Sequence, residues 1–282
     1  MTGRRAIEHA LAHLLLVVVC GLTLYPVLVV LKTALSSTPA LGLSGWPFPT
    51  ELGFQSFVDV ISTRDVQGRW LFGRQLLNSV VIAGATTVLG VAMACTAGYA
   101  FSRFRFPGRD LGMSALLVTQ MFPGVVMSIP LYLLLDHLHL LNTITGLVLV
   151  YSTTSVPFCV WMLKGYFDTI PLDIEHAALV DGASRWTIFT RIVLPLARPA
   201  LVVTALFSFM TAWNEFILAA TFMGDDRSFT LPVVLQRYVG DFGTDWPHFA
   251  AGAVLVSIPV MALFFALQRH LVGGLTAGGV KG

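Results

Sequence analysis

Charged side chains are scarce in this sequence. They make up 11% of its 282 residues, whereas hydrophobic residues make up 56%, and the mean hydropathy is +0.79. A soluble domain of this length cannot bury so much apolar surface, but a lipid bilayer accepts it. The scarcity of charge therefore excludes an ordinary soluble protein and predicts an integral membrane protein in contact with membrane lipids.

Cysteine is rare as well, and it provides no structural framework. Cys20, Cys95 and Cys159 lie far apart in the sequence and inside apolar runs. Because no segment outside these runs contains a cysteine, we expect no disulfide. The spacing of the cysteines does not match a set of metal ligands, and we expect no bound metal.

Motifs for catalysis are missing. The sequence has no G-x-x-x-x-G-K-[ST] phosphate loop and no arrangement of nucleophile, acid and base. We therefore expect no catalytic residue and no cofactor in this chain. The basic run formed by Arg103, Arg105 and Arg109 is too short to predict a nucleic-acid partner.

Six apolar runs are long enough to cross a membrane. A helix needs roughly 20 residues to span about 30 Å of hydrocarbon. The runs cover residues 11–31, 77–101, 111–135, 145–163, 199–222 and 248–267. The first run follows two arginines, as in a signal peptide, but it is too long for one and no convincing cleavage site follows it. The sequence therefore predicts an all-α membrane protein with six transmembrane helices, in a single domain over residues 1–282.

The distribution of basic residues predicts the orientation, because Lys and Arg concentrate in cytoplasmic segments. With the N-terminus inside, most of the 17 basic residues fall on the cytoplasmic side, namely Arg4, Arg5, Arg103, Arg105, Arg109, Lys164, Arg185, Arg191, Arg198, Arg269 and Lys281. Both chain ends and the 164–198 loop are then cytoplasmic. The 33–76 and 223–247 loops face outward.

The loop between the fourth and fifth runs is amphipathic rather than apolar. Pro171 and Asp173 predict the start of a helix, Gly182 a break, Ser184 a second start and Pro195 a stop. Two short helices joined at a glycine and held at a membrane surface would form a docking element. The partner that docks there is the main clue to function.

Two apolar runs carry small residues at helical spacing, which lets a second backbone approach closely. These residues are Gly90, Ala94 and Gly98 in the second run, and Ala200, Thr204, Ser208 and Ala212 in the fifth. The spacing predicts helix–helix packing. The neighbouring helix can belong to this chain or to a partner chain.

The fifth run also has a polar face. Thr204, Ser208, Thr211 and Glu215 lie on one side of a helix, and Asn214 flanks that side. An ionisable group in a membrane costs at least about 2.5 kcal/mol, so it should face protein or water. These residues are candidates for lining a translocation pathway, while a hydrogen bond between helices accounts for Glu215 equally well.

The amphipathic loop carries a family signature. His176-Ala177-Ala178, three residues, Gly182, nine residues and Ile192-Val193-Leu194-Pro195 resemble the E-A-A, x3, G, x9, I-x-L-P pattern of permease subunits of bacterial ABC importers. Asp181 before Gly182 matches the carbohydrate-uptake branch. The glutamate position holds His176, so its contact is either lost or made by Glu175 at a shifted angle.

Other segments look like sugar permeases of the same branch. They are Asn78-Ser79, Tyr99-Ala100-Phe101-Ser102-Arg103 and Trp213-Asn214-Glu215-Phe216. The end of the chain, residues 273–282, is similar to the C-terminus of the smaller membrane subunit of maltose importers. In that subunit the tail enters the interface between two ATPase chains, and the corresponding residues here include Gly278, Gly279 and Lys281. From its glycine-rich composition alone, the tail would be interpreted as a disordered chain end.

The resemblance implies an ATP-driven importer of maltose- or trehalose-type sugars in the plasma membrane, which is the inner membrane of a Gram-negative cell. A homologous second permease would complete the pathway, two cytoplasmic ATPase subunits would bind ATP and Mg²⁺, and an extracytoplasmic sugar-binding protein would deliver substrate. The residues implied in ATPase coupling are Glu175, His176, Ala177, Ala178, Asp181, Gly182, Ile192 and Pro195.

Two alternatives remain open from the sequence. The chain can serve an ABC importer of another solute, because the same loop signature would apply. It can also be a secondary transporter with Glu215 as a proton site. That second reading requires another acid or histidine at matching depth, which the sequence lacks, and it leaves the loop signature unexplained.

Overall fold

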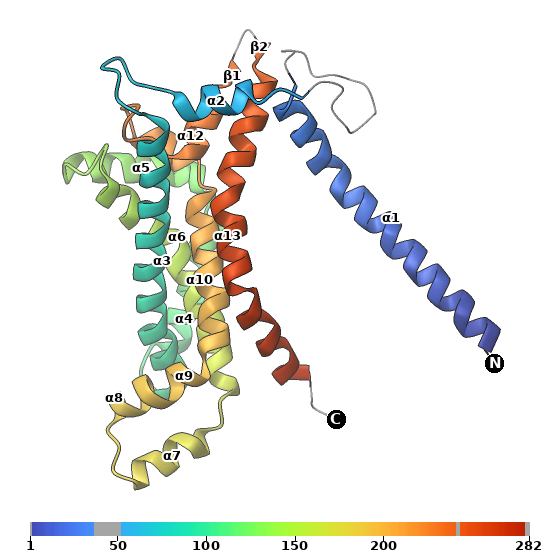
Figure 1. Cartoon of the computed structure of the whole chain (residues 1–282). Coiled ribbons are helices and arrows are strands. Elements are labelled where there is room, and N and C mark those ends of the chain that lie inside the picture. Colours follow the sequence, from blue (N-terminus) through green and yellow to red (C-terminus); the bar gives the residue numbers. More distant parts are fainter. Residues whose placement is uncertain (1, 37–51, 241–242, 280–282) are drawn as a thin grey trace. The chain divides into compact units, whose positions relative to one another are not determined.

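The computed structural model describes residues 2–36, 52–240 and 243–279 (Figure 1). Contacts divide the chain into two compact units: Met1–Phe72 with Val234–Ile258, and Gly73–Val233 with Pro259–Gly282. Each unit is described by itself. The single domain expected over residues 1–282 stays a prediction.

The described residues are mostly helical. The first unit holds α1 (Thr2–Ala34), α2 (Gln55–Ser62) and a short antiparallel hairpin of β1 (Val239–Gly240) and β2 (Gly243–Thr244). Helices α12 (Leu231–Gln236) and α13 (Trp246–Gly279) have residues in both units, as does the helix that begins at Phe72. The long helices of the second unit are α3 (Phe72–Arg103), α4 (Arg109–Met121), α5 (Gly124–His137), α6 (Ile144–Thr169) and α10 (Arg198–Trp213). Its short helices are α7 (Leu172–Val180), α8 (Arg185–Ile188), the π-helix η1 (Phe189–Val193), α9 (Leu194–Leu196) and α11 (Ile217–Phe222).

The predicted all-α membrane fold is confirmed. Within the described residues, four helices are long and apolar enough to cross a membrane: Ile7–Ala34, Phe72–Arg103, Ile144–Thr169 and Trp246–Gln268. The number rises to six if each of two bent helix pairs forms one span. The first, second, fourth and sixth predicted runs each lie within one of the four long helices.

The third predicted run is not one straight helix. The chain turns by 100° between α4 and α5, at Phe122 and Pro123. Proline lacks a backbone N–H and restricts the residue before it to extended conformations, and Phe122 has φ −78° and ψ 125°. Pro123 therefore ends α4, and α5 begins at the following glycine.

The fifth run and the loop before it also differ from the predicted boundaries. Helix α10 ends at Trp213, and α11 begins only at Ile217. The predicted stop at Pro195 is one residue early, because the helical segment ends at Leu196, where the chain turns by 77° into α10. The π-helical turn η1 lies directly before α9; its longer i→i+5 hydrogen bonds widen the turn that must accommodate the proline ring.

Helix α6 forms the interior of the second unit, with α3 and α10 alongside it (Figure 1). A Cβ atom on Gly98 would lie 3.1 Å from the backbone nitrogen of Lys164, and one on Gly90 would lie 3.0 Å from Oγ of Ser155. Ser208 of α10 donates a hydrogen bond to Ser155 at 3.3 Å. Both small-residue patterns therefore pack against a helix of this chain.

We predict that Gly98→Val destabilises the helical bundle by about 1–3 kcal/mol, because its side chain has no space against the α6 backbone. The matched control is Gly84→Val in the same helix, where no atom lies within 4 Å of an added Cβ. Thermal unfolding in detergent measures the difference. Equal unfolding temperatures for the two variants would show that α3 and α6 do not approach closely at Gly98.

Candidate functional site

The amphipathic loop folds as two short helices joined at a glycine, as predicted. Gly182 has φ +82°, and its N–H donates to the carbonyl of Leu179 at 3.0 Å, while Ala183 donates to Ala178 at 2.9 Å. This is the Schellman arrangement that ends a helix at a left-handed residue. Ser184 then caps α8 by accepting a hydrogen bond from the N–H of Thr187 at 3.1 Å.

Glu175 anchors this element to the bundle. It is the buried residue of α7, and its carboxylate accepts hydrogen bonds from Nε of Arg103 at 2.5 Å and from the hydroxyl of Tyr99 at 2.8 Å. Arg103 also donates to the carbonyl of Ile170 at 3.0 Å. The Arg103 and Glu175 side chains are 5% and 4% exposed, so both charges are removed from water.

A second polar contact joins α3 and α6 beside this ion pair. Ser102 donates to the carboxylate of Asp168 at 2.7 Å, and Lys164 pairs with the same carboxylate at 2.7 Å. Figure 1 shows α7 and α8 at this end of α3 and α6. Movement of α7 is thus linked by side-chain contacts to the ends of two long helices.

The same element also carries exposed apolar side chains. Val180 is 88% and Trp186 67% exposed, and Leu172 and Ile174 are also exposed. Several exposed large apolar side chains on one short element suit a surface that binds another protein. We name these four residues the docking face.

The signature residues divide between the two faces. His176, Ala177, Asp181 and Gly182 are exposed, whereas Ala178 and Ile192 pack against the buried cluster around Phe167 and Phe189. Pro195 is half-buried. Glu175 points to Arg103, so it does not supply a carboxylate at the outward position that His176 occupies. The roles of these residues in ATPase coupling stay predictions.

Thr204, Ser208 and Thr211 share one face of α10 as predicted, whereas Asn214 and Glu215 lie beyond its end, and the pathway role of these residues stays a prediction. Thr204 and Ser208 are fully buried against α6, while Asn214 is exposed and donates to the carbonyl of Met210. Thr211 bonds the carbonyl of Phe207 within its own helix. The shared face predicted for Glu215 is wrong, because α10 ends at Trp213.

Glu215 instead holds the break between α10 and α11. Its carboxylate accepts hydrogen bonds from the N–H groups of Leu218 at 2.9 Å and Ala219 at 3.1 Å, and from the hydroxyl of Tyr151 at 2.8 Å. These contacts cap α11 and connect it to α6. They favour the reading of Glu215 as a hydrogen-bonded structural residue.

The predicted C-terminal tail lies partly outside the described residues. Gly278 and Gly279 belong to the last turn of α13, and Lys281 falls beyond the described part. The helix continues past the predicted span, which ended at residue 267, as far as Gly279. The proposed insertion of this tail between ATPase chains stays a prediction.

Sequence reasoning did not identify Tyr99 and Arg103 as site residues. They are four positions apart in α3 and therefore lie on one helical face, which is the available sequence signal. Their partner Glu175 is 72 residues from Arg103 along the chain. Only the fold brings the three side chains together.

Comparisons with known proteins agree with this geometry. Residues 86–276 match the family model described as "Binding-protein-dependent transport system inner membrane component". The trehalose transport system permease SugB of Mycobacterium tuberculosis is 34% identical, with all of both chains covered. The maltose/maltodextrin permease MalG of Escherichia coli K12 is 36% identical over 96% of this chain and 95% of that protein, and MalG of Vibrio vulnificus YJ016 is 43% identical over 73% and 72%.

Solved structures show the same fold. The chain matches a bacterial ABC transporter that imports the acidic polysaccharide alginate, with a TM-score of 0.78, 22% identity, and 95% of this chain and 97% of that chain covered. The MetNI methionine ABC transporter matches with a TM-score of 0.60, 17% identity, and 74% and 99% coverage. At these identities the likeness is one of fold. On the family match and the whole-chain relatives, the protein belongs to the inner membrane components of binding-protein-dependent transport systems.

Proposed function

We propose that this chain is one of two membrane subunits of an ATP-driven sugar importer. The observation that carries the proposal is the α7–α8 element, which is joined to α3 by the buried Arg103–Glu175 pair and leaves Val180 and Trp186 exposed. Such an element can receive a push from a docked protein and pass it to the long helices. Relatives that align over all or nearly all of the chain are sugar permeases, which supports sugar as the substrate class.

The docking face is proposed to bind a cytoplasmic ATPase subunit. A fixed apolar surface with Val180 and Trp186 exposed suits a cleft in another protein. Two such ATPase subunits, one on each membrane subunit, would bind ATP and Mg²⁺, and their closure on ATP would move α7 and α8. ATP would favour the closed ATPase dimer because it binds that state more tightly than the open one, and ATP hydrolysis by those subunits would supply the free energy of the cycle.

The orientation follows from this assignment. The α7–α8 end of the bundle is cytoplasmic, where most of the basic residues lie. The loops at the other end then face outward, where a sugar-binding protein would deliver substrate. The protein is located in the plasma membrane, and a homologous membrane subunit completes the pathway beside it.

Maltose- and trehalose-type oligosaccharides are the proposed substrates. Both MalG and SugB are named for such sugars, and SugB aligns along its entire length. A proton-coupled mechanism has less support, since Glu215 is held by three hydrogen bonds at a helix cap. We infer that solute movement depends on ATP.

Reconstitution tests this function. The chain, its sister membrane subunit, the ATPase and the binding protein encoded beside it are placed in proteoliposomes, and uptake of labelled maltose, trehalose and a panel of amino acids is measured. We expect uptake of at least one disaccharide that requires ATP and the binding protein. Uptake without ATP, or uptake confined to amino acids, would contradict the proposal.

Loss of the buried ion pair should uncouple the transporter. We predict that Glu175→Gln lowers sugar uptake at least about tenfold at equal protein level, because it leaves the Arg103 charge buried without its counter-ion, which typically costs about 3–5 kcal/mol. The readouts are uptake and ATP hydrolysis in the same proteoliposomes, so that sugar moved per ATP is obtained.

Asp173→Asn is the matched control, because it removes one carboxylate from an exposed position of the same helix. It should transport at nearly the normal rate. Membrane insertion of both variants is checked by protein level. Normal sugar moved per ATP in Glu175→Gln would show that the ion pair does not carry the coupling.

A further inference from the structure

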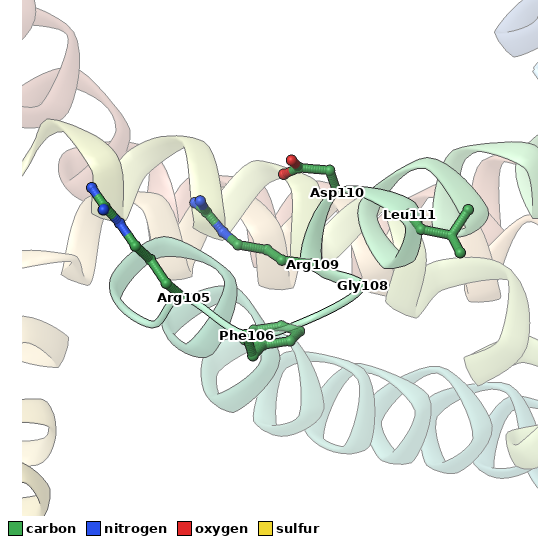
Figure 2. Close-up of a pocket in the computed structure, with 6 residues that line it drawn as sticks. All are labelled: Arg105, Phe106, Gly108, Arg109, Asp110 and Leu111. Carbon is green, nitrogen blue, oxygen red and sulfur yellow. The ribbon is translucent and has the colours of Figure 1, made fainter.

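A surface cavity lies at the turn between α3 and α4, and it is formed by residues outside the docking element. It has a volume of about 360 Å³ and is lined by Arg105, Phe106, Gly108, Arg109, Asp110 and Leu111 (Figure 2). Figure 2 shows the side chains of Arg105 and Arg109 extending to the same side of the turn, while Leu111 points the other way. Two guanidinium groups thus face one opening, with a single carboxylate beside them.

A backbone hydrogen bond fixes the guanidinium group of Arg109 in a position from which it can bind an external ligand. Its Nε donates to the carbonyl of Phe101 at 2.7 Å, which fixes the direction of the guanidinium group and leaves its two terminal nitrogens to bind elsewhere. Arg105 is exposed, and among the described residues it has no hydrogen bond or ion pair within the chain. A forked, permanently charged donor of this kind matches the geometry of a phosphate group.

The backbone adds to the positive field. Helix α4 begins at Arg109, after Gly108 in the left-handed conformation with φ +82°, and its N-terminus has no side-chain cap. The N–H of Arg109 is already used by the carbonyl of Phe106, so the contribution of the helix is the positive end of its dipole, which lies at residues that line the cavity. By itself a helix N-terminus binds little, but here it adds to two arginine side chains.

A second cavity of about 240 Å³ continues the basic surface toward α6. It is lined by Arg109, Asp110, Met113, Ser114, Trp161 and Lys164, and so shares Arg109 and Asp110 with the first. Lys164 contributes an ammonium group that also pairs with Asp168. Three cationic side chains therefore follow one another along the ends of three helices.

Apolar side chains accompany these charges. Leu111 is 75% exposed, and Phe104, Phe106 and Trp161 are also exposed large hydrophobic residues. Cations next to exposed aromatic and aliphatic groups are characteristic of the boundary between membrane and water. A soluble anion would pair with the cationic side chains but would leave these exposed hydrophobic residues without a partner.

We propose that this cavity binds the headgroup of an anionic phospholipid of the cytoplasmic leaflet. The phosphodiester lies between Arg105 and Arg109, and the acyl chains run along the exposed apolar residues of α4. The carboxylate of Asp110 would repel a bare phosphate, but it can accept hydrogen bonds from headgroup hydroxyls, which favours a phosphatidylglycerol-type lipid. The inference rests on the orientation in the proposed function, which places this turn in the cytoplasm.

The test measures lipid retention and needs no transport. The full-length chain, together with the subunits that copurify, is studied in detergent by native mass spectrometry with added phosphatidylglycerol or phosphatidylcholine. Near a membrane surface each arginine contributes about fivefold in affinity, so Arg105→Gln with Arg109→Gln should weaken phosphatidylglycerol binding about 25-fold. The control is Arg191→Gln with Arg198→Gln, which removes two exposed arginines outside the cavity.

Arg105→Gln alone is a second variant that should not unfold the chain, because the Arg105 side chain makes no contact that the fold requires. This single substitution should weaken phosphatidylglycerol binding about fivefold. Equal retention of the two lipids, or equal loss in the double variant and its control, would overturn the proposal. Displacement of the lipid by millimolar inorganic phosphate would show a site for a free anion instead. Failed sugar uptake with intact lipid selectivity would contradict only the proposed function.

Discussion

The buried ion pair between Arg103 and Glu175 is the interaction on which the functional element depends. Removing both charges from water is expensive, and the geometry compensates for this with hydrogen bonds from Arg103 and Tyr99 to the same carboxylate. Breaking either partner leaves a buried charge alone. Because the pair joins α7 to the end of α3, it also determines which face of α7 is exposed.

Helices α3, α6 and α10 pack closely against one another in the bundle that this ion pair joins to α7. Gly90 and Gly98 let α3 approach α6 until a single methyl group would touch the backbone or a serine hydroxyl, and Ser208 brings α10 to the same helix. Tightly packed helices move as units rather than deform. A displacement at α7 can therefore reach the interior of the membrane domain without any flexible linker in between.

Many local features of the fold could be predicted from the chemistry of single residues. The break at Gly182, the cap at Ser184 and the small-residue faces follow from the conformational freedom or size of single residues, and the structure has each of them. Non-local features were not predictable in this way. The partners of Glu175, and Tyr151 as the partner of Glu215 on another long helix, lie 64 or more residues away along the chain. The π-helical turn before Pro195 is likewise not indicated by any single residue.

The central claim is that the docking face meets a cytoplasmic ATPase. The most direct measurement is labelling of Val180→Cys with a membrane-impermeant maleimide, in a chain whose Cys20, Cys95 and Cys159 are replaced. In inside-out membrane vesicles we expect rapid labelling without the ATPase and strong protection when the ATPase is bound. Labelling that the ATPase does not change, or labelling only from the outer side of intact cells, would contradict the claim.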